Sequence, residues 1–434
     1  MKKYALSVVI LTLAVFFFLS QQRASSKSES RFETVSRPQS ARAVAFSVSK
    51  PVGDMATPGV GLGADAKDLS VREVGANDTV FSRVTNGHDT DRSLAEFGDT
   101  PMPPPLLSFP GLSNIDNAFI YSLLIIPPDM NGDVGPKHYV QIVNSLFRVF
   151  DKNGQPMSQP LKISSLFASL GTACSTRNDG LAVVLYDPLA DRWIISQTCT
   201  AFPPFREMVA ISKTGDPLGQ YYAYEFVMPN VKLNDFPKFG VWPDAYYMST
   251  DEFLGADYVG AGAFAFDRAK LLAGDPGAVY IYFNLQVPVG PRQKGLLPAD
   301  MDGLRPPPPG APNVFASYTA TEYGDAQDAL KLYNFHVDFG DPLSSTFTER
   351  RESPLAVAAF DPTSPEGRAD IAQPAPGEKL DSQSDRLNFR LAYRNFGTHE
   401  SLVVNQTVRT SLSDPYRAGV RVYELRKTSS NYAV

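Results

Sequence analysis

Cysteine and histidine are scarce in this chain, which limits the chemistry that it can carry. The 434 residues include two cysteines and four histidines, and the spacing of His88, His138, His336 and His399 is not that of metal ligands. Zinc sites gather three or four Cys, His or acidic ligands, so zinc catalysis is disfavoured. His399 lies beside Glu400 as a candidate acid–base pair, although a single histidine at a strand start more often forms hydrogen bonds in a turn.

The chain also lacks an excess of positive charge and long stretches of helical periodicity. Its formal net charge is -6 and its pI is about 5.4, with no cluster of Lys and Arg. Nucleic acid is therefore not an expected partner. Aromatic residues make up 11% of the chain and occur with β-branched residues in short runs bounded by Gly, Pro and Asp. Such runs predict strands, so the sequence favours an all-β protein.

Only one apolar run is long enough to concern a membrane. It covers residues 4–19, follows two lysines and precedes a polar stretch, which is the arrangement of an export signal. At about 1.5 Å per residue the run spans roughly 24 Å, slightly less than a bilayer core. We therefore expect residues 1–24 to be a signal peptide or a signal anchor. The rest of the chain is expected outside the cytoplasm, either secreted, periplasmic or anchored to the inner membrane by this run.

The two cysteines, Cys174 and Cys199, flank two predicted strands. Disulfides persist outside the cytosol, so a bridge between neighbouring strand ends is the natural interpretation. It would close a loop of about 25 residues, worth on the order of 3 kcal/mol in the chain-entropy model. A metal-binding or nucleophilic thiol is the alternative, but no histidine or acidic cluster accompanies the cysteines.

The region between the apolar run and the first clear strands has a distinct composition. Residues 25–111 are rich in Ser, Ala, Gly, Asp and Pro and show neither strand nor helix periodicity. This composition predicts a disordered linker, which ends in the stiff, proline-rich sequence TPMPPPLL. We expect the folded domain to cover residues 112–434.

Two strand patterns recur in this domain, always in the same order. The first occurs as HYVQIVN, RWIISQ, AYYMST, VFASYT and SLVVNQ, and successive copies are 54, 53, 69 and 87 positions apart at their second residue. The second pattern follows each copy of the first, as FRVFDKNG, MVAISKTGDP, AFAFDRAKLLAGDP, LKLYNFHVDFGDP and VRVYELRK. Repeats of about 50 residues with several strands each are typical of propeller blades.

The sequence therefore predicts a β-propeller of four-stranded blades with five recognisable units. Asn178–Phe226 is the most regular unit, with strands expected at Ala182–Tyr186, Arg192–Gln197, Glu207–Ser212 and Tyr221–Phe226. The fifth unit shows only two recognisable strands. Its blade is either incomplete or completed by a strand from elsewhere, for which Ala118–Ile126 is the candidate. Insertions at 286–312 and 353–384 predict rim loops, where binding sites usually lie.

Asp129, Asn131 and Asp133 form the sharpest local motif, DMNGDVG, in which oxygen side chains alternate around a glycine. The motif resembles the start of a calcium loop, because calcium takes about six or more oxygen ligands from a tightly curved backbone. The twelfth position of such a loop is Val140 instead of glutamate, so a plain tight turn is the alternative. Asp300-Met-Asp302-Gly303 is a weaker second copy. Calcium is the one cofactor that the sequence suggests.

A second candidate site lies near the end of the chain, where arginines occupy every fourth position. Arg386, Arg390 and Arg394 precede His399 and Glu400. If the strand is unbroken, its period of two places the three arginines on one face, where they could hold a carboxylate or phosphate group. These five residues are the candidate ligand-binding residues, and salt-bridged strand ends are the alternative interpretation.

Several longer segments are jointly specific for a known family. They are PPDMNGDVGPKHYVQIVN, VVLYDPLADRWIISQ, FPKFGVWPDAYYMST, LLPADMDGLRPPPPGAPN and DRLNFRLAYRNFGTHESLVVNQTV. Over roughly residues 126–426 the chain resembles a family of exported bacterial β-propeller proteins of unestablished activity, distantly similar to sialidase-like propellers. The resemblance implies the fold and export, and it carries over no catalytic residue. Family members continue beyond the position of Arg426, so a truncated member is one interpretation of this chain.

The residues do not assemble into a complete catalytic set. A sialidase-like hydrolase needs three arginines from separate blades, a tyrosine activated by a glutamate, and an acid–base aspartate. The sequence therefore favours a non-catalytic binding or scaffold propeller at the cell surface or in the periplasm, with a glycan or protein ligand. The alternative is a glycan-directed hydrolase of sialidase-like ancestry that uses the arginine-rich unit.

Overall fold

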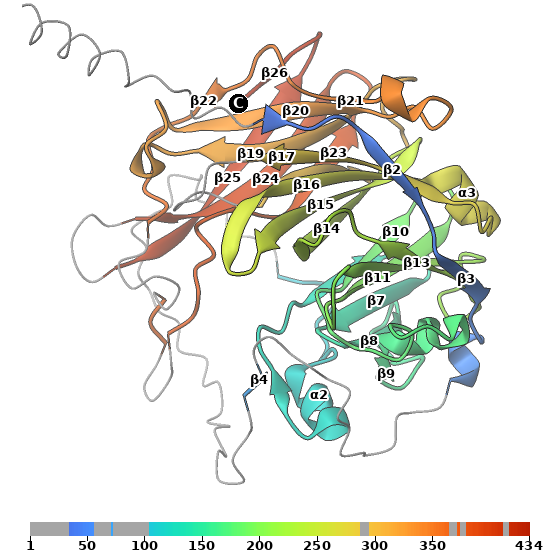
Figure 1. The fold of residues 1–434 in the computed structure, drawn as a ribbon. Helices are drawn as coiled ribbons and strands as arrows, with labels where there is room; N and C mark the ends of the chain where they lie inside the picture. Colours follow the sequence, from blue (N-terminus) through green and yellow to red (C-terminus); the bar gives the residue numbers. More distant parts are fainter. Residues whose placement is uncertain are drawn as a thin grey trace, which may run out of the picture.

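Strands dominate the protein. The computed structural model describes residues 34–55, 71–72, 104–286, 295–363, 371–373, 379–410 and 416–434. Over these residues the chain is all-β, with the short helices α2 (Asn114–Tyr121) and α3 (Arg268–Ala273) and a few 3-10 turns, as Figure 1 shows. In this described part, no helix is long and apolar enough to cross a membrane. The predicted signal segment, residues 1–24, lies outside the described residues.

Most strands belong to five antiparallel units of four strands that follow one another along the chain. Unit one contains β6 (Asn131–Val134), β7 (His138–Val143), β8 (Leu146–Asp151) and β9 (Leu161–Lys162), and unit two contains β10 (Val183–Asp187), β11 (Arg192–Cys199), β12 (Arg206–Ser212) and β13 (Tyr221–Val227). Unit three contains β14 (Leu233–Val241), β15 (Ala245–Leu254), β16 (Asp257–Asp267) and β17 (Val279–Gln286). Unit four contains β18 (Leu297–Asp302), β19 (Asn313–Thr319), β20 (Ala329–His336) and β21 (Thr346–Glu349), and unit five contains β23 (Leu387–Asn395), β24 (Glu400–Arg409), β25 (Ala418–Lys427) and β26 (Tyr432–Ala433).

The two recurrent sequence patterns form the second and third strands of each unit. In three units the aromatic residues at matching places lie opposite each other, as the pairs Tyr139–Phe150, Tyr246–Phe266 and Phe315–Tyr333. The register differs by one position in unit two, where Ile211 lies opposite Ile194 and not opposite Trp193. The sequence therefore predicts the positions of these strands, but it predicts their pairing register only in part.

Three short strands near the N-terminus extend these sheets. Strands β1 (Thr34–Val35) and β2 (Gln39–Arg42) pair with β17, and β3 (Ala45–Val48) pairs with β13. Figure 1 shows this segment, in blue, running from the sheet of unit three to that of unit two. The linker expected over residues 25–111 is thus wrong for residues 34–55. The reason is that strand addition uses backbone hydrogen bonds, so a sequence such as QSAR needs no hydrophobic periodicity.

The segment Ala118–Ile126 is not the closing strand that the sequence suggested. Helix α2 ends at Tyr121, and β5 (Leu124–Ile125) pairs with β4 (Val71–Arg72) in a separate small sheet. The helix forms because Ser113 and Asp116 make a capping box, in which the Asp116 carboxylate accepts the Ser113 backbone N–H at 2.8 Å. Unit five has its own short fourth strand, β26, which pairs with β25.

The apolar core lies between successive units. One buried cluster joins units one and two, a second joins units two and three, and a third joins units three, four and five. Cys174 and Cys199 are buried in the first of these clusters and form the predicted disulfide.

The first strands of the units lie next to one another in chain order. The Asn131 side chain bonds the backbone of β10, and Asp300 bonds that of β14. Strand β18 pairs with β19 only at Leu297 and Pro298, and its remaining residues pair in parallel with β23. Units four and five therefore form one continuous sheet. This arrangement brings polar side chains of β6, β14, β18 and β23 together.

Candidate functional site

Charged side chains gather where the first strands of the units lie together. They are Asp133 on β6, Asp300 and Asp302 on β18, and Arg390 on β23, together with Lys238 on β14, which lies over the ring of Phe389, the residue before Arg390. We call these five residues the inner-strand cluster. Each comes from the first strand of its unit, so the fold assembles them from positions that are far apart in the sequence.

Arg390 is the centre of the inner-strand cluster. Its guanidinium Nη1 donates to the Asp300 carboxylate, and its Nη2 donates to Asp302 Oδ1 at 2.5 Å. The three side chains differ in exposure, at 31% for Arg390, 3% for Asp300 and 37% for Asp302. One guanidinium thus joins a buried carboxylate to an accessible one.

Asp300 is anchored on both of its oxygen atoms. Its Oδ1 accepts the backbone N–H of Val241 at 2.9 Å, and its Oδ2 accepts from Arg390. Burial raises the pKa of Asp300 to about 6, although the Arg390 charge opposes the rise. Since it is buried and fully engaged, Asp300 can position Arg390 but cannot contact a substrate directly.

Asp133 is only partly buried and approaches the cluster from the first unit. Its oxygen atoms accept the backbone N–H groups of Tyr186 and Val134, both at 2.7 Å. Burial raises its pKa despite these hydrogen bonds and the charge of Arg390, and the Asp302 carboxylate adds to the rise. Asp133 therefore favours its protonated form more than an ordinary aspartate does.

Lys238 adds a cation with aromatic surroundings. Its ammonium nitrogen lies 3.9 Å from the ring centroid of Phe236 and 5.6 Å from that of Phe389. Burial lowers the pKa of Lys238, while the Asp129 carboxylate opposes this. Both rings are partly exposed, so they offer apolar surface beside the charged groups.

The structure does not gather the three candidate arginines at one ligand. The ladder between β23 and β24 shifts register between Asn388 and Ala392, so the strand is not regular as the sequence argument required. Arg386 is buried and donates to Asp385 and Asp251. Arg394 is exposed and lies over the Phe396 ring, at 5.3 Å from its centroid.

His399 and Glu400 do not form an acid–base pair with each other. The His399 ring stacks on Phe396, with ring centroids 4.8 Å apart, and its Nδ1 lies 3.1 Å from the Thr398 hydroxyl. Glu400 accepts hydrogen bonds from the Tyr393 hydroxyl at 2.9 Å and from Lys427 at 2.8 Å. Glu400 thus links β24 to β23 and β25, whereas His399 packs within the turn between β23 and β24.

The Tyr393–Glu400 contact has the composition of a sialidase nucleophile but not its setting. Tyr393 is fully buried, and its ring packs edge-on against Trp242 at a centroid distance of 4.7 Å. Burial raises the Tyr393 pKa well above its usual range, and the Glu400 charge raises it further. A substrate cannot reach this hydroxyl, so the pair is structural.

Most of the candidate calcium motif lies in a strand, and Asp129 precedes that strand. Asn131–Val134 is β6, which corrects the alternative of a plain tight turn. Asn131 Oδ1 accepts the Val184 backbone N–H at 2.8 Å and its Nδ2 donates to the Ala182 carbonyl at 2.7 Å. Within the described residues, no group of three or more His, Cys, Asp or Glu side chains is arranged to hold a metal. Calcium at Asp129, Asn131 and Asp133 stays an untested prediction.

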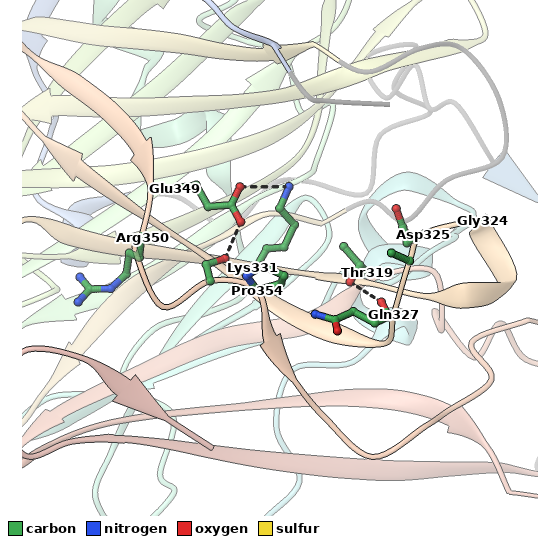
Figure 2. Close-up of a pocket in the computed structure, with 10 residues that line it drawn as sticks. Thr319, Gly324, Asp325, Gln327, Lys331, Glu349, Arg350 and Pro354 are labelled. Carbon is green, nitrogen blue, oxygen red and sulfur yellow. Dashed lines mark hydrogen bonds and ion pairs between the residues drawn. The ribbon is translucent and has the colours of Figure 1, made fainter. Parts of the chain in front are cut away.

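A groove at the outer edge of unit four is a second place for a ligand. It has a volume of about 590 Å³, and Figure 2 shows Lys331 and Glu349 side by side along one side of it. Their charged atoms are 3.7 Å apart. Thr319 and Gln327 line its other side. The groove contains no member of the inner-strand cluster, so the two places can be tested separately.

The sequence had named four of the five members of the inner-strand cluster but not their association. The sequence predicts Arg390 as part of an arginine row, and Asp133, Asp300 and Asp302 as metal ligands. Lys238 was missed, and so was the contact of Arg390 with carboxylates 88 and 90 positions away. One sequence signal is common to the five residues: each lies in the first strand of a unit, just before a recurrent strand.

Comparison with known proteins adds little to this geometry. No family model matches the chain, and no curated protein is similar to it in sequence. Among solved structures, a GH43 beta-1,3-galactosidase is similar with 10% identity and a TM-score of 0.31, over 68% of this chain and 55% of the galactosidase chain. The matched region thus spans about half of that protein. Values this low carry neither an activity nor a blade arrangement to the present chain, and the sialidase-like ancestry stays a prediction.

Proposed function

We propose that this protein is a glycan-directed hydrolase that acts at the inner-strand cluster, and that its five units are the blades of a propeller around that cluster. One observation carries the proposal. Two partly exposed carboxyl groups, Asp133 and Asp302, come from different units and lie within electrostatic reach of each other and of Arg390.

Glycosidic bond cleavage commonly uses two carboxyl groups with different protonation states. One donates a proton to the leaving oxygen, and the other acts as base or nucleophile. Asp133 suits the first role, because burial raises its pKa. Asp302 suits the second, because the Arg390 guanidinium donates to it. In this proposal Asp300 acts as a positioning residue that holds Arg390 from the buried side.

The surroundings of the cluster suit a sugar. The Phe236 and Phe389 rings are partly exposed beside Lys238, and aromatic rings with nearby polar groups are common in sugar sites. The predicted export signal would deliver the enzyme to glycans of the cell surface or periplasm. The Cys174–Cys199 disulfide supports this location, since disulfides persist outside the cytosol.

The test is hydrolysis of a panel of aryl glycosides and oligosaccharides, including galactosides, arabinosides and sialosides, by the purified protein. We expect turnover of at least one substrate, and a fall of about 100-fold or more in kcat for Asp133→Asn and for Asp302→Asn. Glu349→Gln, in the outer groove, is the matched control and should keep wild-type kcat. Loss of activity in the control alone would move the reaction to the groove of Figure 2.

Glycan binding without turnover is the second candidate, and one feature favours it. Both oxygen atoms of Asp133 already accept backbone N–H groups, which is also what a structural aspartate does. Calorimetric binding to the same panel separates the two. Saturable binding that is lost in Asp302→Asn, with no product formed by the wild type, would replace the hydrolase proposal with the binding one.

A further inference from the structure

Units two and three face each other across a buried interface whose composition changes along its length. Most of it is apolar, formed by residues such as Ile194, Phe239 and Met248. Towards one end of the strands the facing residues become polar. They are Ser196 and Thr198 on β11, Glu207 on β12, Asn234 on β14 and Thr250 on β15. Each is exposed by 2% or less, and we call them the buried oxygen cluster.

Hydrogen bonds within this cluster account for only one oxygen of the Glu207 carboxylate. Glu207 Oε2 accepts from the Thr198 hydroxyl and from Asn234 Nδ2, both at 3.1 Å, so the second contact crosses from unit two to unit three. Four other buried oxygen atoms form no hydrogen bond of normal geometry with the described residues, although Ser196 lies close enough to Glu207 to lower the pKa of its carboxyl. They are Glu207 Oε1, Asn234 Oδ1, Ser196 Oγ and Thr250 Oγ1.

The charge of Glu207 is also uncompensated within the described part of the chain. The neighbouring acid of this interface, Glu252, is neutralised by Lys232 at 2.8 Å and accepts from the Tyr282 hydroxyl at 2.6 Å. No ion pair is formed by Glu207 with any described residue. A buried carboxylate without a positive partner is costly, because transfer of its charge from water is uncompensated.

Gly262 lets the Thr250 and Glu252 side chains pack directly against the backbone of β16. A Cβ at this position would lie 2.6 Å from Thr250 Oγ1 and 2.9 Å from Glu252 Oε1. Any larger residue would therefore displace the Thr250 hydroxyl from the interface.

We propose that the buried oxygen cluster binds a hard cation through Glu207 Oε1, Asn234 Oδ1, Ser196 Oγ and Thr250 Oγ1, and so fastens unit two to unit three. The donor set is one carboxylate with amide and hydroxyl oxygens, which suits Na⁺ or Ca²⁺ and not a transition metal. The site is separate from the inner-strand cluster and does not depend on the proposed hydrolase activity.

A proton is the competitor of this cation. Without the ion, burial raises the Glu207 pKa to about 8, and the protonated carboxyl can donate from Oε1 to a neighbouring oxygen. The charged groups that face this region are Glu252 and Lys232, which neutralise each other.

The experiment measures unfolding of the whole protein by denaturant in chelator-treated buffer with choline chloride as the background salt. NaCl, KCl, CaCl₂ or MgCl₂ is then added alone at matched ionic strength. We expect one ion to lower the unfolding equilibrium constant saturably, by about 100-fold at 100 times its Kd. The effect should be lost in Glu207→Gln and weakened in Thr250→Val, which keeps the side-chain shape.

Two control variants make the assignment specific. Glu225→Gln changes another buried glutamate of the same sheet, which pairs with Arg206, and should keep the ion response. Asp133→Asn should keep it as well, which separates this site from the calcium motif of β6. An ion response that survives in both Glu207→Gln and Thr250→Val, or the absence of any response in the wild type, would overturn the proposal. If Glu207→Gln does not fold, Thr250→Val with a weakened response supports it.

Discussion

At the scale of single residues, burial decides which polar groups are available for chemistry. Tyr393 and Glu400 lie 2.9 Å apart, and Asp302 and Arg390 lie 2.5 Å apart, so both contacts are short. Only the second pair is accessible, because Tyr393 is fully buried while the Asp302 side chain is 37% exposed. Short contacts alone therefore do not identify a site in this protein.

Tyr393→Phe tests this distinction. If Tyr393 is structural, its removal costs one hydrogen bond to the Glu400 carboxylate, about 1 to 2 kcal/mol of unfolding free energy, since Glu400 retains Lys427. Substrate turnover, or glycan binding if no turnover exists, should remain within about twofold of wild type. Denaturant unfolding and the glycoside panel measure the two quantities. A loss of activity larger than 100-fold with unchanged stability would instead make Tyr393 a nucleophile.

At the scale of strands and helices, the sequence predicts the strands that belong to a recurrent apolar pattern. It misses the strands that have no such pattern. The second and third strands of each unit are largely apolar runs that recur along the chain in the same order, so the sequence shows their repetition. The first strand of unit one, NGDV, is polar because its side chains bond the backbone of β10. It therefore looked like a turn or a calcium loop.

The same reasoning explains which site residues could be predicted. Arg390 and Asp133 stood out because of local patterns, a row of arginines and a run of oxygen side chains. Their association with Asp300 and Asp302 depends on how β18 leaves β19 to pair with β23. This change of partner strand depends on packing between units, so no local sequence pattern predicts it. Lys238 had no pattern around it at all.

The N-terminal strands provide a prediction at this scale. Residues 34–55 cover the outer edges of β17 and β13, and they include the buried residues Ser49 and Val52. A chain that starts at residue 56 exposes both edges, so its melting temperature should fall by about 5 °C or more and it should aggregate sooner. A chain that starts at residue 34 is the matched control. Equal melting temperatures for the two would show that the edge strands contribute nothing.

At the scale of the whole molecule, buried acids give the protein an unusual expected response to pH. Burial raises the pKa of six described carboxyl groups, which are Asp133, Glu207, Asp244, Asp251, Glu252 and Asp300. For two of them the raised pKa reaches about 6 (Asp300) and about 8 (Glu207), so in the folded state these two groups keep protons that the unfolded chain releases above about pH 4. The contribution of these groups to the free energy of unfolding is therefore largest at low pH. It is lost as the pH rises through the pKa that each group has in the folded state.

Thermal unfolding across pH in cation-free buffer tests this balance. We expect the melting temperature to fall between about pH 5 and pH 8.5, because each group contributes a slope of up to about 1.4 kcal/mol per pH unit below its folded pKa. Glu207→Gln should flatten the part of the curve between pH 6 and 8, since the pKa of Glu207 is about 8. Asp300→Asn should flatten the part below pH 6, where Asp300 titrates. A melting temperature that rises steadily from pH 5 to 8.5 without cations would mean that these carboxylates are charged and paired in the folded protein.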